Sequence, residues 1–120
     1  MQVNFEKSVT ILYSSDVTRS IAYYTEKLGF DQSWEWDTPA TFGGISKGTV
    51  EVFFCKENQG NPGTWLCIIL DDVDAYYNAI REKGAKIVAA PESKEWSMRE
   101  MLVEDPDGHI IRFGHRIDCD

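Results

Sequence analysis

The chain has 120 residues, a length that fits a single domain with one hydrophobic core. Its formal net charge of −8 argues against a nucleic-acid partner, because phosphate contacts need clustered Lys and Arg. No run of about 18 apolar residues occurs and the start lacks a leader pattern, so we expect a cytoplasmic protein with no membrane segment. We expect reduced, mostly buried thiols at Cys55, Cys67 and Cys119.

The first half of the chain predicts a strand, a helix and three further strands. Asp16 is placed to cap a helix whose apolar residues recur at helical spacing until Gly29 ends it. Gly43-Gly44 predicts a bulge or a close backbone approach. The predicted strands cover residues 8–13, 30–36, 41–46 and 49–55.

The second half repeats this order after the linker-like segment 57–63, which is rich in Gly, Pro and Asn. Asp72 is placed to cap a second helix, and Gly84 ends it. Segment 91–95 is predicted to be a loop. The predicted strands cover 64–70, 85–89 and the two arms of a hairpin within 96–115.

The closing hairpin turns at Asp105-Pro106-Asp107-Gly108. This order suits a type I turn, with Asp at the first position, Pro presetting φ at the second and Gly at the fourth. The turn alone indicates a hairpin and no function. Its combination with Trp96 and Arg99-Glu100 before it, and with an apolar strand after it, is more specific.

Taken in order, these motifs resemble the vicinal oxygen chelate superfamily, in its glyoxalase and bleomycin-resistance branch. The resemblance runs from about residue 8 to residue 114 and rests on several short motifs. They are Asp16-Val17 with Leu28-Gly29-Phe30, Asp72-Val73-Asp74 with Lys83-Gly84, and Trp96-Ser97-Met98-Arg99-Glu100 with the Asp-Pro-Asp-Gly turn.

The resemblance implies an α+β fold in which two βαβββ units form a curved eight-stranded mixed sheet. That sheet makes a cup, and the helices lie on its outer side. We therefore expect one domain over 1–120, with unit one at about 8–56, the linker at 57–63 and unit two at about 64–116. The resemblance also implies a homodimer with ligand sites in the cups.

Enzymes of this family hold a divalent metal with His and Glu ligands from the first and last strands of each unit. The matching positions here are Val9, Glu51, Trp65 and Arg112. Valine and indole cannot bind a metal, and a guanidinium repels one. One carboxylate is too few for zinc, nickel or iron, so we expect neither a metal nor another cofactor.

His109 and His115 are the two histidines of the chain. Strand alternation places them on the face opposite Arg112, so both should point away from the cup. We expect them to be turn-edge or surface residues. No serine elbow, phosphate loop or dinucleotide fingerprint occurs, so the sequence predicts no catalytic residue.

Aromatic residues are the cup's most informative feature. In the bleomycin-resistance branch, residues matching Trp34, Phe42 and Trp96 stack on the drug. Alternation adds Phe53 beside Glu51 on the inner face. The alternative is that these rings are core or interface residues. The predicted ligand-binding residues are Trp34, Phe42, Glu51, Phe53, Trp65, Trp96 and Arg112.

Glu51 and Arg112 share the inner face in this alignment. Buried charges are costly unless they are paired, so the two should either bond to each other or contact a ligand. In the second case Arg112 would hold a carboxylate or phosphate, and Glu51 an ammonium or hydroxyl.

Three functions remain open from the sequence. The preferred one is a metal-free, non-catalytic protein that sequesters a small aromatic and cationic molecule, as in bleomycin resistance, in clefts at a dimer interface. The cationic preference follows from the acidic net charge. The second is a metal-dependent lyase, isomerase or dioxygenase of the glyoxalase type. The third is an accessory module that binds a metabolite.

Overall fold

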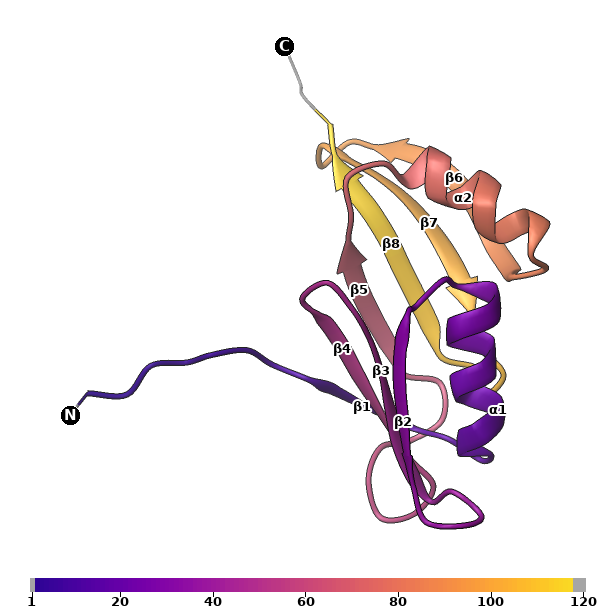
Figure 1. Ribbon diagram of the computed structural model, residues 1–120. Coiled ribbons are helices and arrows are strands. Elements are labelled where there is room, and N and C mark those ends of the chain that lie inside the picture. The colour runs from indigo at the N-terminus through magenta and orange to yellow at the C-terminus, as the bar shows by residue number, and fades with distance from the viewer. Residues whose placement is uncertain (1, 118–120) are drawn as a thin grey trace.

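Two βαβββ units follow each other along the chain in the computed structural model, which describes residues 2–117 (Figure 1). Unit one contains β1 (Thr10–Tyr13), α1 (Val17–Ala22), β2 (Gln32–Trp36), β3 (Phe42–Lys47) and β4 (Val50–Cys55). Unit two contains β5 (Trp65–Ile69), α2 (Val73–Glu82), β6 (Lys86–Lys94), β7 (Met98–Glu104) and β8 (Ile110–Arg116). The predicted α+β class and unit order are confirmed.

The eight strands form two four-stranded mixed sheets with the same topology. Sheet A has the order β1-β4-β3-β2, and sheet B has the order β5-β8-β7-β6. In each sheet the first and last strands of the unit run parallel, and the remaining neighbours run antiparallel. One face of each sheet packs on the helices (Figure 1). We call the opposite face of each sheet its cup face.

Both helices begin and end where the sequence predicts. The side chain of Asp16 accepts a hydrogen bond from the Arg19 amide, and that of Asp72 accepts one from the Ala75 amide. After α1 the chain continues as a π-helical turn over Tyr23–Lys27. Gly29 then takes a φ of +80°, which glycine adopts without steric cost.

The helix-facing side chains of both sheets form one shared core. Its fully buried members come from α1 and its π-helical turn, from the sheets and from α2, so neither unit closes a core alone. The largest of them are Tyr24, Phe54, Phe113, Leu12, Leu28, Ile45 and Ile80.

Strand β6 is longer than predicted, and the expectation of a loop over 91–95 is wrong for most of that segment. The strand runs through Pro91 because β6 is the edge of sheet B, where an unpaired position needs no amide donor. Its pairing with β7 shifts register between Ile87 and Ala89 and again between Ala89 and Glu92. Bulges of this kind accommodate a proline that a central strand would exclude.

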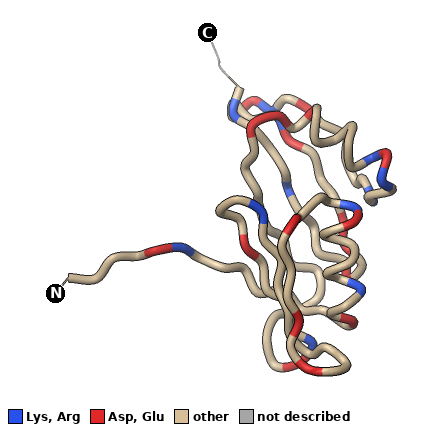
Figure 2. Tube along the Cα trace, viewed as in Figure 1, with Lys and Arg blue, Asp and Glu red and all other residues tan. Residues whose placement is uncertain are grey.

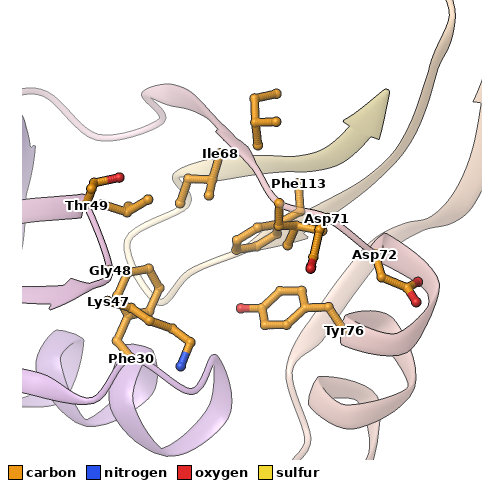
Figure 3. A pocket seen from close by; sticks show the side chains of 12 residues that line it. Phe30, Lys47, Gly48, Thr49, Ile68, Asp71, Asp72, Tyr76 and Phe113 are labelled. Atoms are coloured by element: carbon orange, nitrogen blue, oxygen red, sulfur yellow. The ribbon is translucent and has the colours of Figure 1, made fainter. Parts of the chain in front are cut away.

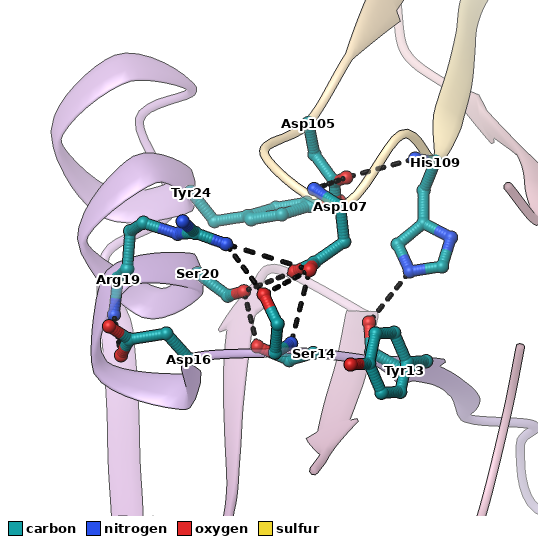
Figure 4. A network of polar contacts seen from close by, with 10 residues as sticks. Tyr13, Ser14, Asp16, Arg19, Ser20, Tyr24, Asp105, Asp107 and His109 are labelled. Atoms are coloured by element: carbon teal, nitrogen blue, oxygen red, sulfur yellow. Dashed lines mark hydrogen bonds and ion pairs between the residues drawn. The ribbon is translucent and has the colours of Figure 1, made fainter. Parts of the chain in front are cut away.

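The turn of the closing hairpin is bonded to unit one through Asp105 (Figure 4). The Gly108 amide donates to the Asp105 carbonyl at 3.0 Å, which closes the predicted turn. Asp105 Oδ1 accepts the amides of Asp107 and His109, and the Tyr24 hydroxyl donates to Oδ2 at 2.8 Å. Burial raises the pKa of Asp105, and burial next to this carboxylate raises the pKa of Tyr24 well above its usual range.

Asp107 makes a second connection between the same turn and the start of α1. Its Oδ1 accepts hydrogen bonds from the Ser15 amide at 3.1 Å and from the Ser15 hydroxyl at 2.6 Å. The Ser20 hydroxyl donates to Oδ2 at 3.3 Å, and Arg19 Nη2 lies 3.5 Å from Oδ1. The turn therefore fixes how the two units sit on each other (Figure 4).

His109 is fully buried, so the expectation of a turn-edge or surface residue is wrong. Its Nδ1 accepts a hydrogen bond from the Thr64 amide at 3.0 Å, which requires a lone pair on that atom. Nε2 therefore carries the proton and donates to the Tyr13 carbonyl at 2.7 Å. His115 Nδ1 accepts the Val73 amide at 2.8 Å. Both imidazole rings therefore hydrogen-bond one element of the fold to another.

Charged residues are interspersed along the described chain, and no run of Lys or Arg gathers on one element (Figure 2). Residues 2–9 leave the body as an extended arm on which Phe5 is almost fully exposed (Figure 1). Neither α1 nor α2, nor any other helical stretch of residues 2–117, has the length and hydrophobicity to cross a bilayer.

Candidate ligand-binding site

The cup face of sheet A carries a cluster of three predicted site residues. Trp34 of β2, Phe42 of β3 and Phe53 of β4 contact one another edge to face, with ring centroids 5.4 to 5.5 Å apart. Such geometry is the favoured one for aromatic pairs. The three rings are half-buried to exposed, so they form a surface that is apolar and already packed.

Gly44 makes this cluster possible. It lies opposite Trp34 on one neighbouring strand and opposite Phe53 on the other. A Cβ atom at Gly44 would be 2.6 Å from Trp34 Nε1, so only glycine lets the indole lie across β3. The close backbone approach that the glycine pair predicts is confirmed at Gly43, beside the Trp34 carbonyl. Gly43 points to the other face, where a Cβ would meet Ile21 and the Trp34 carbonyl at 2.8 Å.

Glu51 lies on β4 and is bonded to the N-terminal arm. Lys7 Nζ donates to Glu51 Oε1 at 2.6 Å, and this hydrogen bond raises the pKa of Lys7. Of the two alternatives for Glu51 and Arg112, pairing with each other does not occur within the described chain, and contact with a ligand stays a prediction. Arg112 is instead near Glu100, with Nη1 3.6 Å from Oε2.

The cup face of sheet B holds the remaining predicted residues. Trp65 on β5 and Trp96, just before β7, are 58% and 56% exposed. Together with Arg112 on β8 they line a hollow of about 200 Å³. A second hollow of about 170 Å³ shares Trp65 and Arg112 and is completed by Leu66 and Cys67. The structure thus brings these three predicted residues to one surface.

Glu100 is a residue of this surface that the sequence prediction missed. It is only 7% exposed, and its Oε2 accepts a hydrogen bond from Trp96 Nε1 at 3.2 Å. Glu100 also lines the hollow of about 200 Å³. Strand alternation could have found it, because Met101 and Val103 fill the core and Glu100 must then face the cup.

The four positions that match metal ligands in the family carry no joint donor set. Val9 precedes β1, Glu51 is bonded to Lys7, and Trp65 and Arg112 line the hollows of sheet B. Within residues 2–117, no three His, Cys, Asp or Glu side chains come together in a way that could hold a metal ion. These residues do not fit a zinc, nickel or iron centre.

A cavity of about 370 Å³ lies elsewhere, between the β3–β4 turn and the start of α2 (Figure 3). Its walls are core side chains such as Phe30 and Phe113. Two of its polar groups already have partners, because the Tyr76 hydroxyl donates to the Leu28 carbonyl and Lys47 pairs with Asp31. It contains none of the predicted site residues, and we assign it to the seam between the units.

Two of the three cysteines lie within the described residues. Cys55 is buried, and its thiol lies 2.7 Å from the Glu57 carbonyl, as the expectation of buried thiols requires. Cys67 is exposed on the cup face of sheet B, contrary to that expectation, because β5 turns Ile68 to the core and its neighbours outward. Cys119 lies outside the described residues.

Comparison with other proteins gives relatives of similar length. An uncharacterized protein, YraH, of Bacillus subtilis (strain 168) is 29% identical over 117 residues, which cover 85% of this chain and 91% of that protein. A bleomycin-binding protein from Streptomyces verticillus, solved with copper(II)-bleomycin, is 20% identical with a TM-score of 0.76 and covers 93% of this chain and 97% of its own.

A bleomycin resistance determinant encoded on transposon Tn5 is 24% identical with a TM-score of 0.77, covering 93% of this chain and 98% of its own. At these identities the two solved structures establish the shared fold. The family model of the Glyoxalase/Bleomycin resistance protein/Dioxygenase superfamily matches residues 8–113, which is most of the chain. The chain therefore belongs to the glyoxalase/bleomycin resistance protein/dioxygenase superfamily.

Proposed function

We propose that this protein is a metal-free binding protein that sequesters a small aromatic molecule without transforming it. The observation that carries the proposal is the pair of exposed indoles, Trp65 and Trp96, beside Arg112 on the cup face of sheet B. Two of these three residues stand where the family's enzymes place metal ligands. Indoles supply stacking surface at little entropic cost, which is what sequestration requires.

The family setting supports the same proposal. The Streptomyces verticillus relative binds bleomycin by its description, and the Tn5 relative confers resistance to it. Binding a drug in this way needs affinity and no catalysis. A glyoxalase-type enzyme would need a donor set that residues 2–117 do not bring together.

We further propose that two copies complete the cleft. The cup faces expose large apolar side chains on both sheets, among them Trp34, Ile69 and Trp96. Apolar surface of this extent is normally covered by a partner. A second copy would set the packed rings of one sheet A against the indoles of the other chain's sheet B. Light scattering at micromolar concentration should then give twice the chain mass.

Intrinsic tryptophan fluorescence tests the function. Titration with metal-free bleomycin and with a panel of small aromatic compounds of both charges should give saturable quenching for at least one compound. Elemental analysis after gel filtration without chelator should find no stoichiometric transition metal. One zinc, nickel or iron per chain, together with no quenching by any compound, would replace the proposal with a metal enzyme.

A further inference from the structure

The guanidinium of Arg112 is an open anion-binding group at the centre of the sheet B cup face. Arg112 lies on an interior strand, opposite Cys67 of β5 on one side and Leu102 of β7 on the other. Its side chain is 43% exposed. The guanidinium has five N–H donors, and within residues 2–117 none of them makes a hydrogen bond. The 3.6 Å separation from Glu100 is too long for one.

Glu100 attracts this guanidinium electrostatically but accepts no hydrogen bond from it. Trp96 covers the carboxylate and donates to its Oε2, the same oxygen that is close to Arg112. A carboxylate this buried needs a neighbouring positive charge, so Arg112 is kept at the surface of the hollow. The other charged residues of the hollow, Glu92 and Lys94, pair with each other at 3.6 Å.

The two hollows are open to solvent, and each has room for a single ring. Their volumes are about 200 and 170 Å³, and a cavity of about 150 Å³ is known to admit benzene. Each hollow therefore has room for one six-membered ring. Trp65 lines both hollows and Trp96 lines the larger one, so a ring placed there lies against indole.

We propose that the cup face of sheet B binds a monocyclic aromatic carboxylate, with its carboxylate on the Arg112 guanidinium and its ring against Trp65 and Trp96. This inference rests on the proposed binding function and names its ligand class. A carboxylate matches the fork of N–H donors of an arginine. A cation would instead be repelled by Arg112 and would have to compete with it for a carboxylate that the Trp96 indole already bonds.

This ligand differs in sign from the one that the net charge of −8 suggested. Net charge acts over long range and governs the rate of approach, and salt screens it. Contact specificity follows from the groups at the surface. In the Arg112–Glu100 ion pair the exposed member is the cation, because the carboxylate is buried and bonded to the Trp96 indole.

The test uses three probes of the same shape: benzoate, benzamide and benzamidinium, which are anionic, neutral and cationic. Ligand-observed NMR and calorimetric titration of the full chain should give benzoate at least about tenfold tighter than either analogue. Arg112→Gln should bring benzoate to the level of benzamide. Arg81→Gln, which removes the same charge from α2, should leave benzoate binding unchanged.

Removing Arg112 alone leaves Glu100 buried without a cation, so the single variant can lose stability. The double variant Arg112→Gln with Glu100→Gln removes both charges and should also lose the preference for benzoate. Arg112→Lys keeps the charge without the fork and should show an intermediate affinity.

Tighter binding of benzamidinium or benzamide than of benzoate would overturn this inference and leave the binding function standing. Benzoate binding that survives in the folded double variant would likewise place the anion elsewhere. Failure of all three probes at millimolar concentration would overturn the inference too. The binding function itself fails only if the wider aromatic panel and bleomycin also give no saturable response.

Discussion

The two cup faces present aromatic residues in opposite ways. On sheet A, the rings of Trp34, Phe42 and Phe53 contact one another edge to face. The missing side chain of Gly44 leaves room for the Trp34 indole. On sheet B, Trp65 and Trp96 contact no other aromatic ring within residues 2–117, and their neighbours are charged. The same strand order thus gives a packed apolar cup face on sheet A and an exposed cup face with charged groups on sheet B. Only the cup face of sheet B has exposed groups available to a ligand.

The largest effect on stability should come from a substitution on the helix-facing side of β3, beneath the ring cluster of sheet A. Gly43→Ala should destabilise the protein by about 1–3 kcal/mol, because the new Cβ meets the Trp34 carbonyl and the core residues Ile21 and Val17. Denaturant unfolding measures this. Gly44→Ala is the matched control, since its Cβ meets only the movable Trp34 indole and should cost less. Equal losses would contradict the assignment of the two glycines to opposite faces.

Removing a ring should separate the two faces in stability. Phe53→Ala should cost about 2 kcal/mol, less than a fully buried Phe because this ring is half-buried, yet it packs against both Trp34 and Phe42. Trp65→Ala should change stability by no more than about 0.5 kcal/mol, as for exposed surface positions. If Trp65→Ala proves as costly as Phe53→Ala, the sheet B face is not open in the way described.

Trp96→Ala should weaken aromatic ligand binding about tenfold, equivalent to about 1.4 kcal/mol, with little change in thermal stability. Its indole is 56% exposed and covers Glu100, which water can solvate once the ring is gone. Ligand titration and thermal unfolding of the same preparations give both quantities. Trp96→Phe retains a ring without the Nε1 donor and should lose less. A large stability loss with unchanged affinity would make Trp96 a packing residue.

The stability of the contact between the two units should depend on pH through Asp105. Burial raises its folded-state pKa, so its contribution to stability is present below the unfolded value of about 3.9 and is lost as pH rises through the raised folded value. Denaturant unfolding from pH 4 to 7 should show this loss, and Asp105→Asn should remove it. An unchanged pH profile in that variant would assign the effect to another group.

Asp74 should show a smaller effect of the opposite sign. Its hydrogen bonds to Arg99, at 2.8 and 2.9 Å, lower its pKa at the exposed contact between α2 and β7. Its contribution is therefore present above the unfolded pKa and is lost as pH falls through the lowered folded value. Asp74→Asn should flatten the acidic side of the profile slightly, and added salt should reduce the difference.

Most of the fold was predictable because its signals are local. The caps at Asp16 and Asp72, the glycines that end each helix and the Asp-Pro-Asp-Gly turn each act within a few residues. The extension of β6 through Pro91 was not predictable, since only its edge position makes that proline acceptable.

The site was predictable only in part, for the same reason. The family resemblance singled out Trp34, Phe42 and Arg112, and alternation added Phe53 to the inner face. Hydrogen-bond partners that are distant in sequence could not be predicted from these patterns. Glu51 bonds to Lys7, 44 residues away, and Thr64 bonds to His109, 45 residues away. The burial of a histidine and the pairing of a carboxylate depend on such contacts. The alternation of side chains along a strand carries no information about them.

The bonds that Asp105 and Asp107 make across the seam also bear on how the chain folds during synthesis. They join residues 81 to 92 positions apart, from the first helix to the last turn. The Tyr24 hydroxyl and the Ser15 amide therefore lack these carboxylate partners until the closing hairpin has left the ribosome. Contacts of such long range slow folding, because a large loop must close before they form. Unit one is thus completed by the closing hairpin of unit two, and a nascent chain that stops before this turn lacks the bonds that hold the two units together.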